Sequence, residues 1–143
     1  MACTLQLRLS LFLESNRVMA SSPSATKTPH PTEITLHQKS RELEIAFDDG
    51  KRFRFTCEFL RVHSPSAEVR GHGPGQEVLQ VGKREVNITN LEPVGSYAIK
   101  PTFSDGHDTG LYSWEYLHEL GVKEQDYWRN YLARMESAGA SRG

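Results

Sequence analysis

Apolar and polar side chains alternate along three consecutive stretches in the first half of the chain. The apolar positions are Ile34 and Leu36, then Leu43, Ile45 and Phe47, then Phe53 and Phe55. A period of two is typical of strands that bury one face. The turn Asp48-Asp49-Gly50 between the second and third stretches favours a hairpin, because glycine tolerates positive φ. The pattern predicts a three-stranded antiparallel meander with one apolar face and one charged face.

The alternation stops after Thr56. Residues 57–61 are predicted to form a helical turn, and the following stretch to Gly75 is rich in Gly, Pro and Ser with no apolar period. A loop of this length inside a compact domain is usually functional or disordered. Short strands are then predicted at 78–81 and around Val86 and Ile88, followed by a strand over 97–103. Pro101 within it indicates an edge or an ending, and these strands together predict a second small sheet.

Helical spacing takes over near the C-terminus. Trp114, Leu117 and Leu120 recur three residues apart, and Gly121 is expected to stop this helix. A second helix over 123–137 carries an apolar stripe that suits either core packing or partner binding, made of Tyr127, Trp128, Tyr131, Leu132 and Met135. Residues 138–143 are expected to fray. The predicted fold class is α+β, with two small antiparallel sheets followed by C-terminal helices.

The first 30 residues fit this pattern least. Their apolar residues are interrupted by Arg8, and no run approaches the roughly 20 residues that a membrane span needs. An organelle-targeting segment and a natural start at Met19 are two further interpretations. We interpret residues 1–30 as a disordered extension, residues 31–121 as the domain, and residues 122–143 as an amphipathic helix with a frayed tail.

Composition narrows the class of protein. The chain has 143 residues with 17 basic and 18 acidic side chains, so no nucleic-acid partner is predicted. Cys3 and Cys57 are too few for a disulfide framework, which favours a reducing cytoplasm. The sequence holds no phosphate-binding glycine loop with a lysine, no HExxH, no CxxC and no nucleophile elbow.

Candidate chemistry gathers at the junction between the last predicted strand and the first C-terminal helix. Asp105-Gly-His-Asp108 is a polar, turn-prone cluster in a position where loops often carry function. His63, His72 and His107 all fall in predicted loops, and three imidazoles with a water would suit Zn²⁺ or Fe²⁺. Their spacing matches no standard metal motif. The alternative is that these histidines cap turns and bond to the backbone.

Several segments resemble one known family. They are Leu60-Arg-Val-His-Ser-Pro-Ser-Ala-Glu-Val-Arg-Gly-His72, Asn87-Ile-Thr, Val94-Gly-Ser-Tyr-Ala-Ile and Asp105-Gly-His-Asp-Thr-Gly-Leu-Tyr-Ser-Trp-Glu-Tyr-Leu117. Over residues 31–121 the chain resembles the gamma-butyrobetaine hydroxylase-like N-terminal domain family, also called DUF971, in its stand-alone bacterial form. Similar domains precede the catalytic domain of 2-oxoglutarate-dependent hydroxylases, and others are appended to plastid iron–sulfur carriers of the Mrp/ApbC type.

The resemblance also implies a structural zinc held by three cysteines and one histidine. Laid on this chain, those positions fall at Ser64, Ser66, Val69 and His107. Serine and valine cannot replace thiolates as zinc ligands. The zinc site is therefore predicted to be lost, unless His63 and His72 bind a metal together with His107.

Two functions from different classes follow. The first is a non-enzymatic binding or scaffold module, accessory to iron–sulfur or metal metabolism, that docks a protein such as an Mrp/ApbC-type carrier through Trp114, Tyr112 and Asp105. No cofactor is assured for it, no membrane contact is expected, and its sheet edges could pair in a homodimer. The second is a small protein or enzyme that uses zinc or iron bound by His63, His72 and His107. The oxygenase activity of the hydroxylases belongs to a further domain for which this chain has no room.

Overall fold

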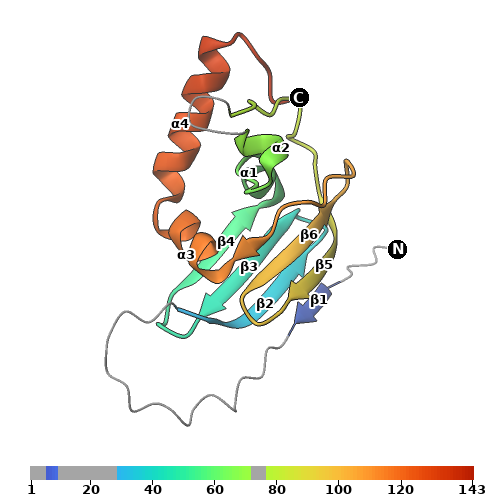
Figure 1. The fold of residues 1–143 in the computed structure, drawn as a ribbon, viewed down its shortest axis with the longest axis vertical. Coiled ribbons are helices and arrows are strands. Elements are labelled where there is room, and N and C mark those ends of the chain that lie inside the picture. The colour runs from blue at the N-terminus through green and yellow to red at the C-terminus, as the bar shows by residue number, and fades with distance from the viewer. Residues whose placement is uncertain (1–5, 10–28, 72–76) are drawn as a thin grey trace.

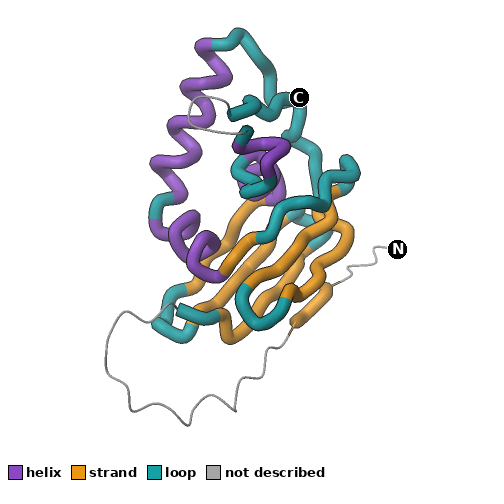
Figure 2. Tube along the Cα trace, viewed as in Figure 1, coloured by secondary structure: helices purple, strands orange, loops and turns teal. Residues whose placement is uncertain are grey.

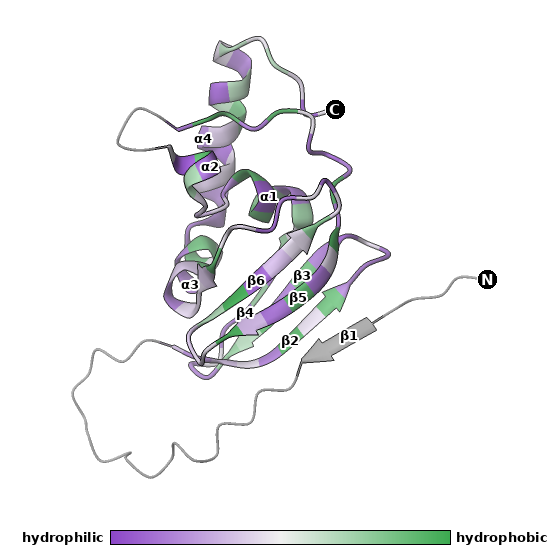
Figure 3. Ribbon diagram, turned by 45° about the vertical axis from the view of Figure 1, so that its right-hand side comes forward, coloured by the Kyte–Doolittle hydropathy of each residue, from purple (hydrophilic) through white to green (hydrophobic). Residues whose placement is uncertain are grey.

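The predicted meander forms the centre of the larger sheet. The computed structural model describes residues 6–9, 29–71 and 77–143 (Figure 1), and its sheet has the order β1-β2-β3-β4. The three predicted strands are β2 (Pro31–His37), β3 (Glu42–Phe47) and β4 (Arg52–Thr56). Their antiparallel register aligns the apolar residues in two rows across the sheet, Ile34–Ile45–Phe53 and Leu36–Leu43–Phe55. Figure 3 shows the alternation of hydrophobic and hydrophilic residues along these strands.

The opposite face of this sheet is charged, as predicted. Arg52 bonds to Glu44 at 2.6 Å and Arg54 bonds to Glu42 at 2.7 Å, in each case across the β3–β4 pair. Hydrogen bonds from His37 and Arg52 lower the pKa of Glu44 below its usual value. Such exposed pairs contribute little to stability, so this face is a solvated surface with matched charges.

The first strand was not predicted. β1 (Gln6–Leu9) pairs antiparallel with β2, from Gln6 opposite His37 to Leu9 opposite Ile34. The prediction of disorder over residues 1–30 is therefore wrong for this segment. The free edge of β2 offers unpaired backbone groups to any extended segment, and the alternating leucines of the N-terminal sequence suit that role. The remainder of the predicted extension, apart from residues 29 and 30, lies outside the described residues.

The second sheet is also present. It consists of β5 (Ile88–Val94), β6 (Ala98–Phe103) and β7 (Tyr112–Ser113) in that order. Pro101 lies in the central strand, but β7 pairs only with Ala98 and Ile99, so the strand has a free edge beside the proline. The strand predicted at 78–81 is absent: that segment is irregular, and the Val78 amide donates to the carbonyl of Val69.

Within the residues that the structure describes, four helices complete the α+β fold, and Figure 2 shows helices gathered at one end of the strands. They are α1 (Cys57–Val62), α2 (Ala67–Arg70), α3 (Trp114–Val122) and α4 (Glu124–Ser137). The Ser113 side chain caps α3 by accepting from the Tyr116 amide at 3.1 Å. Gly121 does not stop α3. A Cβ there would lie 2.4 Å from the Phe53 ring, so the glycine lets the helix approach the sheet closely. No helix of the described residues is long and apolar enough to span a membrane.

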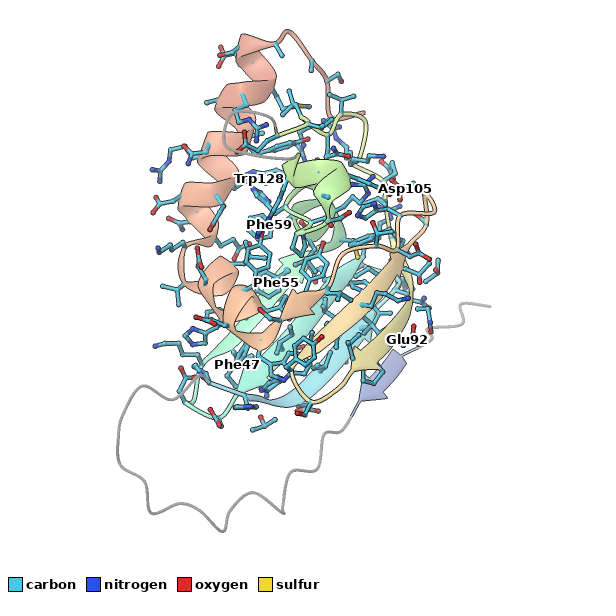
Figure 4. All side chains as sticks on the ribbon, in the orientation of Figure 1. Phe47, Phe55, Phe59, Glu92, Asp105 and Trp128 are labelled. Carbon is cyan, nitrogen blue, oxygen red and sulfur yellow. The ribbon has the colours of Figure 1, made fainter. Side chains whose placement is uncertain are left out.

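One apolar core joins the two sheets and the helices. Its members include Ile34 and Phe55 from the larger sheet and Ile99 from the smaller one, all 0 % exposed. A chain of ring contacts runs from Phe47 through Phe53, Phe55 and Phe59 to Trp128 on α4 (Figure 4). This chain connects the far end of the sheet to the C-terminal helix.

The two C-terminal helices bury the predicted faces. Trp114, Leu117 and Leu120 of α3 are all buried. On α4, Tyr131 and Met135 pack with Val62 in a second small cluster, which supports core packing as the role of the stripe. Leu132 is the exception among the stripe residues, because its side chain is exposed.

The C-terminal tail does not fray as predicted. The amides of Gly82 and Arg84 donate to the carbonyls of Ser141 and Arg142, at 3.0 and 2.9 Å. The Arg142 guanidinium makes two 2.8 Å hydrogen bonds to the buried carboxylate of Glu58. Figure 1 shows the C-terminus returning beside the segment that precedes β5. The ion pair between Arg142 and the buried Glu58 carboxylate therefore holds the C-terminal tail against the domain.

Candidate functional site

A tight turn after β6 points His107 into the protein. The Asp105 carboxylate accepts from the His107 amide at 3.2 Å, and the Gly106 amide donates to the Phe103 carbonyl at 2.9 Å. Gly106 has a φ of 92°, a conformation that glycine adopts easily. The Phe103 amide in turn donates to the His107 carbonyl. The polar cluster predicted from the sequence is thus the turn that orients one imidazole.

His107 lies in a chain of three side chains. Its Nε2 is 2.9 Å from the Ser64 Oγ, and its Nδ1 is 3.2 Å from a carboxylate oxygen of Glu68. A proton on Nδ1 faces the carboxylate, so Nε2 accepts the hydroxyl proton of Ser64, as this network of partners requires. Ser64 Oγ also accepts from the Ser66 amide at 3.2 Å. The loop between α1 and α2 is thereby joined to the turn after β6.

The surroundings of these hydrogen-bonded side chains favour the neutral form of the His107 imidazole and the charged form of the Asp105 carboxylate. Burial lowers the pKa of His107, and the nearby Arg61 lowers it further, against the opposing effect of Glu68. Burial alone would raise the pKa of Asp105, but hydrogen bonds from Lys83 and the His107 amide, together with the Arg61 charge, lower it to about 2. Asp105 bonds to Lys83 at 2.6 Å and to Arg61 at 3.0 Å.

The order hydroxyl, imidazole, carboxylate is that of serine hydrolases, but the environment of Ser64 is different. Its side chain is buried at 1 % exposure, and a Cβ placed on Gly110 would lie 2.4 Å from its Oγ. A nucleophile must meet the carbon that it attacks. Ser64 is packed against the backbone of Gly110. The hydrogen bonds between Ser64, His107 and Glu68 therefore serve in this structure as a structural link between two loops.

The residues at the implied zinc positions do not fit zinc. Ser64 and His107 bond directly to each other, and Ser66 bonds to Thr109 at 2.7 Å. Val69 is buried and offers no ligand atom. Zinc in such sites needs thiolate or imidazole donors in tetrahedral order. The zinc position that the resemblance implies is filled here by hydrogen-bonded hydroxyls and an imidazole.

The other predicted metal ligands lie in different surroundings or outside the described residues. His63 bonds through Nδ1 to the Phe59 carbonyl at 2.9 Å, and its ring packs on Phe59, Tyr127 and Tyr131. Burial lowers the pKa of His63. His72 lies outside the described residues. In the described part of the chain no three His, Cys, Asp or Glu side chains gather as a metal site would require, so the metal site stays a prediction.

Cys57 is not a candidate ligand or nucleophile. It is fully buried, and burial raises the pKa of its thiol to about 12. The thiolate form is the one that binds metals and attacks substrates. Cys57 therefore acts as a small buried apolar residue of the core.

The predicted docking residues do not form a surface. Tyr112 is 0 % exposed and donates its hydroxyl to the Leu60 carbonyl, and Trp114 is 4 % exposed with its Nε1 bonded to the Ser96 carbonyl. Asp105 is exposed but engaged with Lys83 and Arg61. The aromatic pattern that suggested docking is a core pattern, because aromatic residues that start a helix beside a sheet are buried by that sheet.

A pocket of about 600 Å³ opens on the other side of Ser64, between the α1–α2 region and α3 and α4. Its apolar and aromatic wall is made of Val62, Val69, Val78, Tyr116 and Tyr127. Its polar members include His63, Arg70, Glu77 and Arg134. Sequence reasoning missed this pocket because the lining comes from four separate stretches. The available signal was the long Gly-, Pro- and Ser-rich segment after α1, in which Arg70 lies.

The architecture and the turn motif define a small α+β domain of a known class. The family model described as gamma-butyrobetaine hydroxylase-like, N-terminal, matches residues 34–118. The chain belongs to this family, which confirms the resemblance. No curated protein matches the chain.

Solved structures agree with the family. Two solution structures determined by NMR, each described only as a protein, are 46 % and 52 % identical to this chain. They cover 81 % and 85 % of it and 91 % of their own length, each with a TM-score of 0.71. A crystal structure of a DUF971 protein of unknown function from Acidithiobacillus ferrooxidans ATCC 23270 is 39 % identical. It covers 68 % of this chain and 98 % of its own, with a TM-score of 0.56.

Proposed function

We propose that this protein is a non-enzymatic binding module, accessory to iron–sulfur or metal metabolism. The observation that carries the proposal is the pocket of about 600 Å³ beside the Ser64–His107 link. Binding sites for small groups usually have volumes of about 300–1,000 Å³ and mostly apolar walls with a few polar groups. The pocket has this composition, and much of its lining lies on α1, α2, α3 and α4.

The candidate reactive groups support binding over catalysis. Ser64 and Cys57 are buried, and both nitrogens of the His107 imidazole are occupied by hydrogen bonds to other side chains. A catalytic acid or base must reach the proton that it moves. These groups instead stabilise the link between two loops that border the pocket.

The family supplies the expected partner. Because similar domains are appended to iron–sulfur carriers of the Mrp/ApbC type, we propose such a carrier as the protein that this module binds. A free module and a carrier would then associate in the cytoplasm, whereas the related plastid proteins hold both parts on one chain.

Isothermal titration of the purified protein with a purified Mrp/ApbC-type carrier, with and without its cluster, tests this proposal. Val78 and Val81 are a matched pair, because both are exposed valines of one segment and Val78 lines the pocket whereas Val81 does not. Val78→Trp is expected to weaken binding at least about ten-fold, which is about 1.4 kcal/mol. Val81→Trp should change it less than about two-fold. Absence of a complex at micromolar concentrations, or equal effects of the two variants, would overturn the proposal.

A further inference from the structure

The hydroxyl groups in the pocket wall are already used by the protein. Tyr116 donates its hydroxyl to the His63 carbonyl at 2.6 Å, and Tyr127 donates its hydroxyl to the Glu119 carboxylate. Burial, with the nearby Glu119 charge, raises the pKa of Tyr127 to about 12, so its hydroxyl stays neutral. The two tyrosines therefore line the pocket with their hydroxyl groups engaged, beside the valine side chains. A ligand body that fits this wall is apolar or aromatic.

The two arginines of the lining are not neutralised by a carboxylate. Within the described part of the chain, no acidic side chain lies in ion-pair distance of Arg70 or Arg134. The Arg70 guanidinium lies over the Tyr116 ring, 4.8 Å from its centroid, which fixes its position at the wall. Most other arginines of the described chain differ, since Arg41, Arg52, Arg54, Arg61, Arg129 and Arg142 each bond to an acidic side chain.

The charge of the lining points to a single negative charge on the ligand. Arg70 and Arg134 contribute two positive charges and Glu77 contributes one negative charge, which gives a net charge of +1 with His63 neutral. A ligand with two negative charges would exceed the net positive charge of the lining and would be repelled by the Glu77 carboxylate. The planar guanidinium matches a carboxylate in a two-point hydrogen bond.

We propose that the pocket binds a small organic acid, with one carboxylate held by Arg70 and Arg134 and an apolar or aromatic body against Tyr116 and Tyr127. This inference rests on the proposed binding function and names the chemical class of the ligand. The carboxylate lies at the exposed arginines and the body enters between α1 and the two C-terminal helices. The acid would thereby occupy the space next to the Ser64–His107 link.

Titration of ¹⁵N-labelled protein, followed by NMR, tests the inference with three acids and their neutral amides: indole-3-acetate, 4-phenylbutyrate and octanoate. The amides have nearly the same shape and lack the charge. At least one acid is expected to bind about ten-fold or more tightly than its amide, because hydrogen bonds between charged groups are the stronger ones. The shifted resonances are expected to include those of Arg70, Tyr116 and Tyr127.

Arg134→Gln and Arg70→Gln are expected to weaken binding of that acid about ten-fold each. Arg129→Gln is the matched control. Like Arg134, Arg129 lies on α4 and is exposed, but it bonds to Asp126 and does not line the pocket. Its effect should stay below about two-fold. The inference would be overturned by equal binding of acids and amides, or by equal effects of all three variants. It would also be overturned if no acid binds at about 10 mM, a concentration far above ordinary ligand dissociation constants. A carrier complex that forms while every acid fails would overturn only the ligand class and leave the proposed function standing.

Discussion

Replacement of Arg142 by alanine tests a contact between residues that are 84 positions apart in the sequence. Its two 2.8 Å hydrogen bonds reach Glu58, whose side chain is 6 % exposed, while Arg142 itself is 34 % exposed. Removal of one partner of a fully buried pair costs about 3–5 kcal/mol. Here water can reach the carboxylate from the side that Arg142 leaves open, so the cost falls below that range, to about 1.5–3 kcal/mol. Loss of the contact with the Trp128 ring, 5.2 Å from the guanidinium, adds about 0.5–1 kcal/mol.

We therefore expect Arg142→Ala to lower the free energy of unfolding by about 2–4 kcal/mol. Urea denaturation followed by circular dichroism measures it, with Arg129→Ala as the control for a surface pair that should cost less than about 0.5 kcal/mol. A double-mutant cycle with Glu58→Gln should give a coupling of at least about 1 kcal/mol, since the two groups are in contact. A cost below about 1 kcal/mol for Arg142→Ala, or additive effects in the cycle, would refute the docked position of the C-terminal tail.

Three further predictions concern the core and the turn after β6. Trp114→Ala should cost about 3–5 kcal/mol in the same assay, because the indole is 4 % exposed; a cost below about 1 kcal/mol would show an exposed contact residue instead. The pKa of Asp105 is lowered from 3.8 to about 2, so the charged form is favoured in the folded state, and its contribution is present above about pH 4 and lost as pH falls toward 2. Because Asp105 is exposed, solvent screening reduces this contribution. Asp105→Asn should therefore reduce the difference in unfolding free energy between pH 4 and pH 2 by about 1 kcal/mol, and an unchanged difference would contradict the ion pair with Lys83. His107→Ala should cost about 1 kcal/mol through loss of the bonds to Ser64 and Glu68, with no change in metal content; protein purified without a histidine tag that carries stoichiometric zinc or iron, lost in His107→Ala, would instead support the metal-binding alternative.

The sheets could be predicted because their signals are local. The rows Ile34–Ile45–Phe53 and Leu36–Leu43–Phe55 follow from a period of two and one glycine turn. β1 was missed because its partner residues on β2 lie 25 to 31 positions away in the chain. A four-residue pattern does not indicate which strand it will pair with. Gly121 was predicted to end a helix because glycine often does so. In the structure the residue lies inside α3, where the Phe53 ring leaves no room for a larger side chain.

The site could be predicted only in part, and the reason lies in how its residues are brought together. His107 was found from a local turn motif, but its partners Ser64 and Glu68 lie 43 and 39 residues away. The family correspondence placed Ser64 and His107 at one site, and in the structure a 2.9 Å hydrogen bond joins them.

The hydrogen bonds at the implied zinc position explain how the domain holds its two loops together without thiolate ligands. A structural metal fixes two loops by bonding to both. In this chain Ser64 accepts from the Ser66 amide and bonds to His107, while Ser66 bonds to Thr109, so the same two loops are joined at two points. The segment from Phe103 to Leu117 therefore positions the wall of a pocket through its buried side chains. In the proposed ligand complex, Arg70 and Arg134 of the pocket lining bind the carboxylate, and no local sequence motif marked either residue.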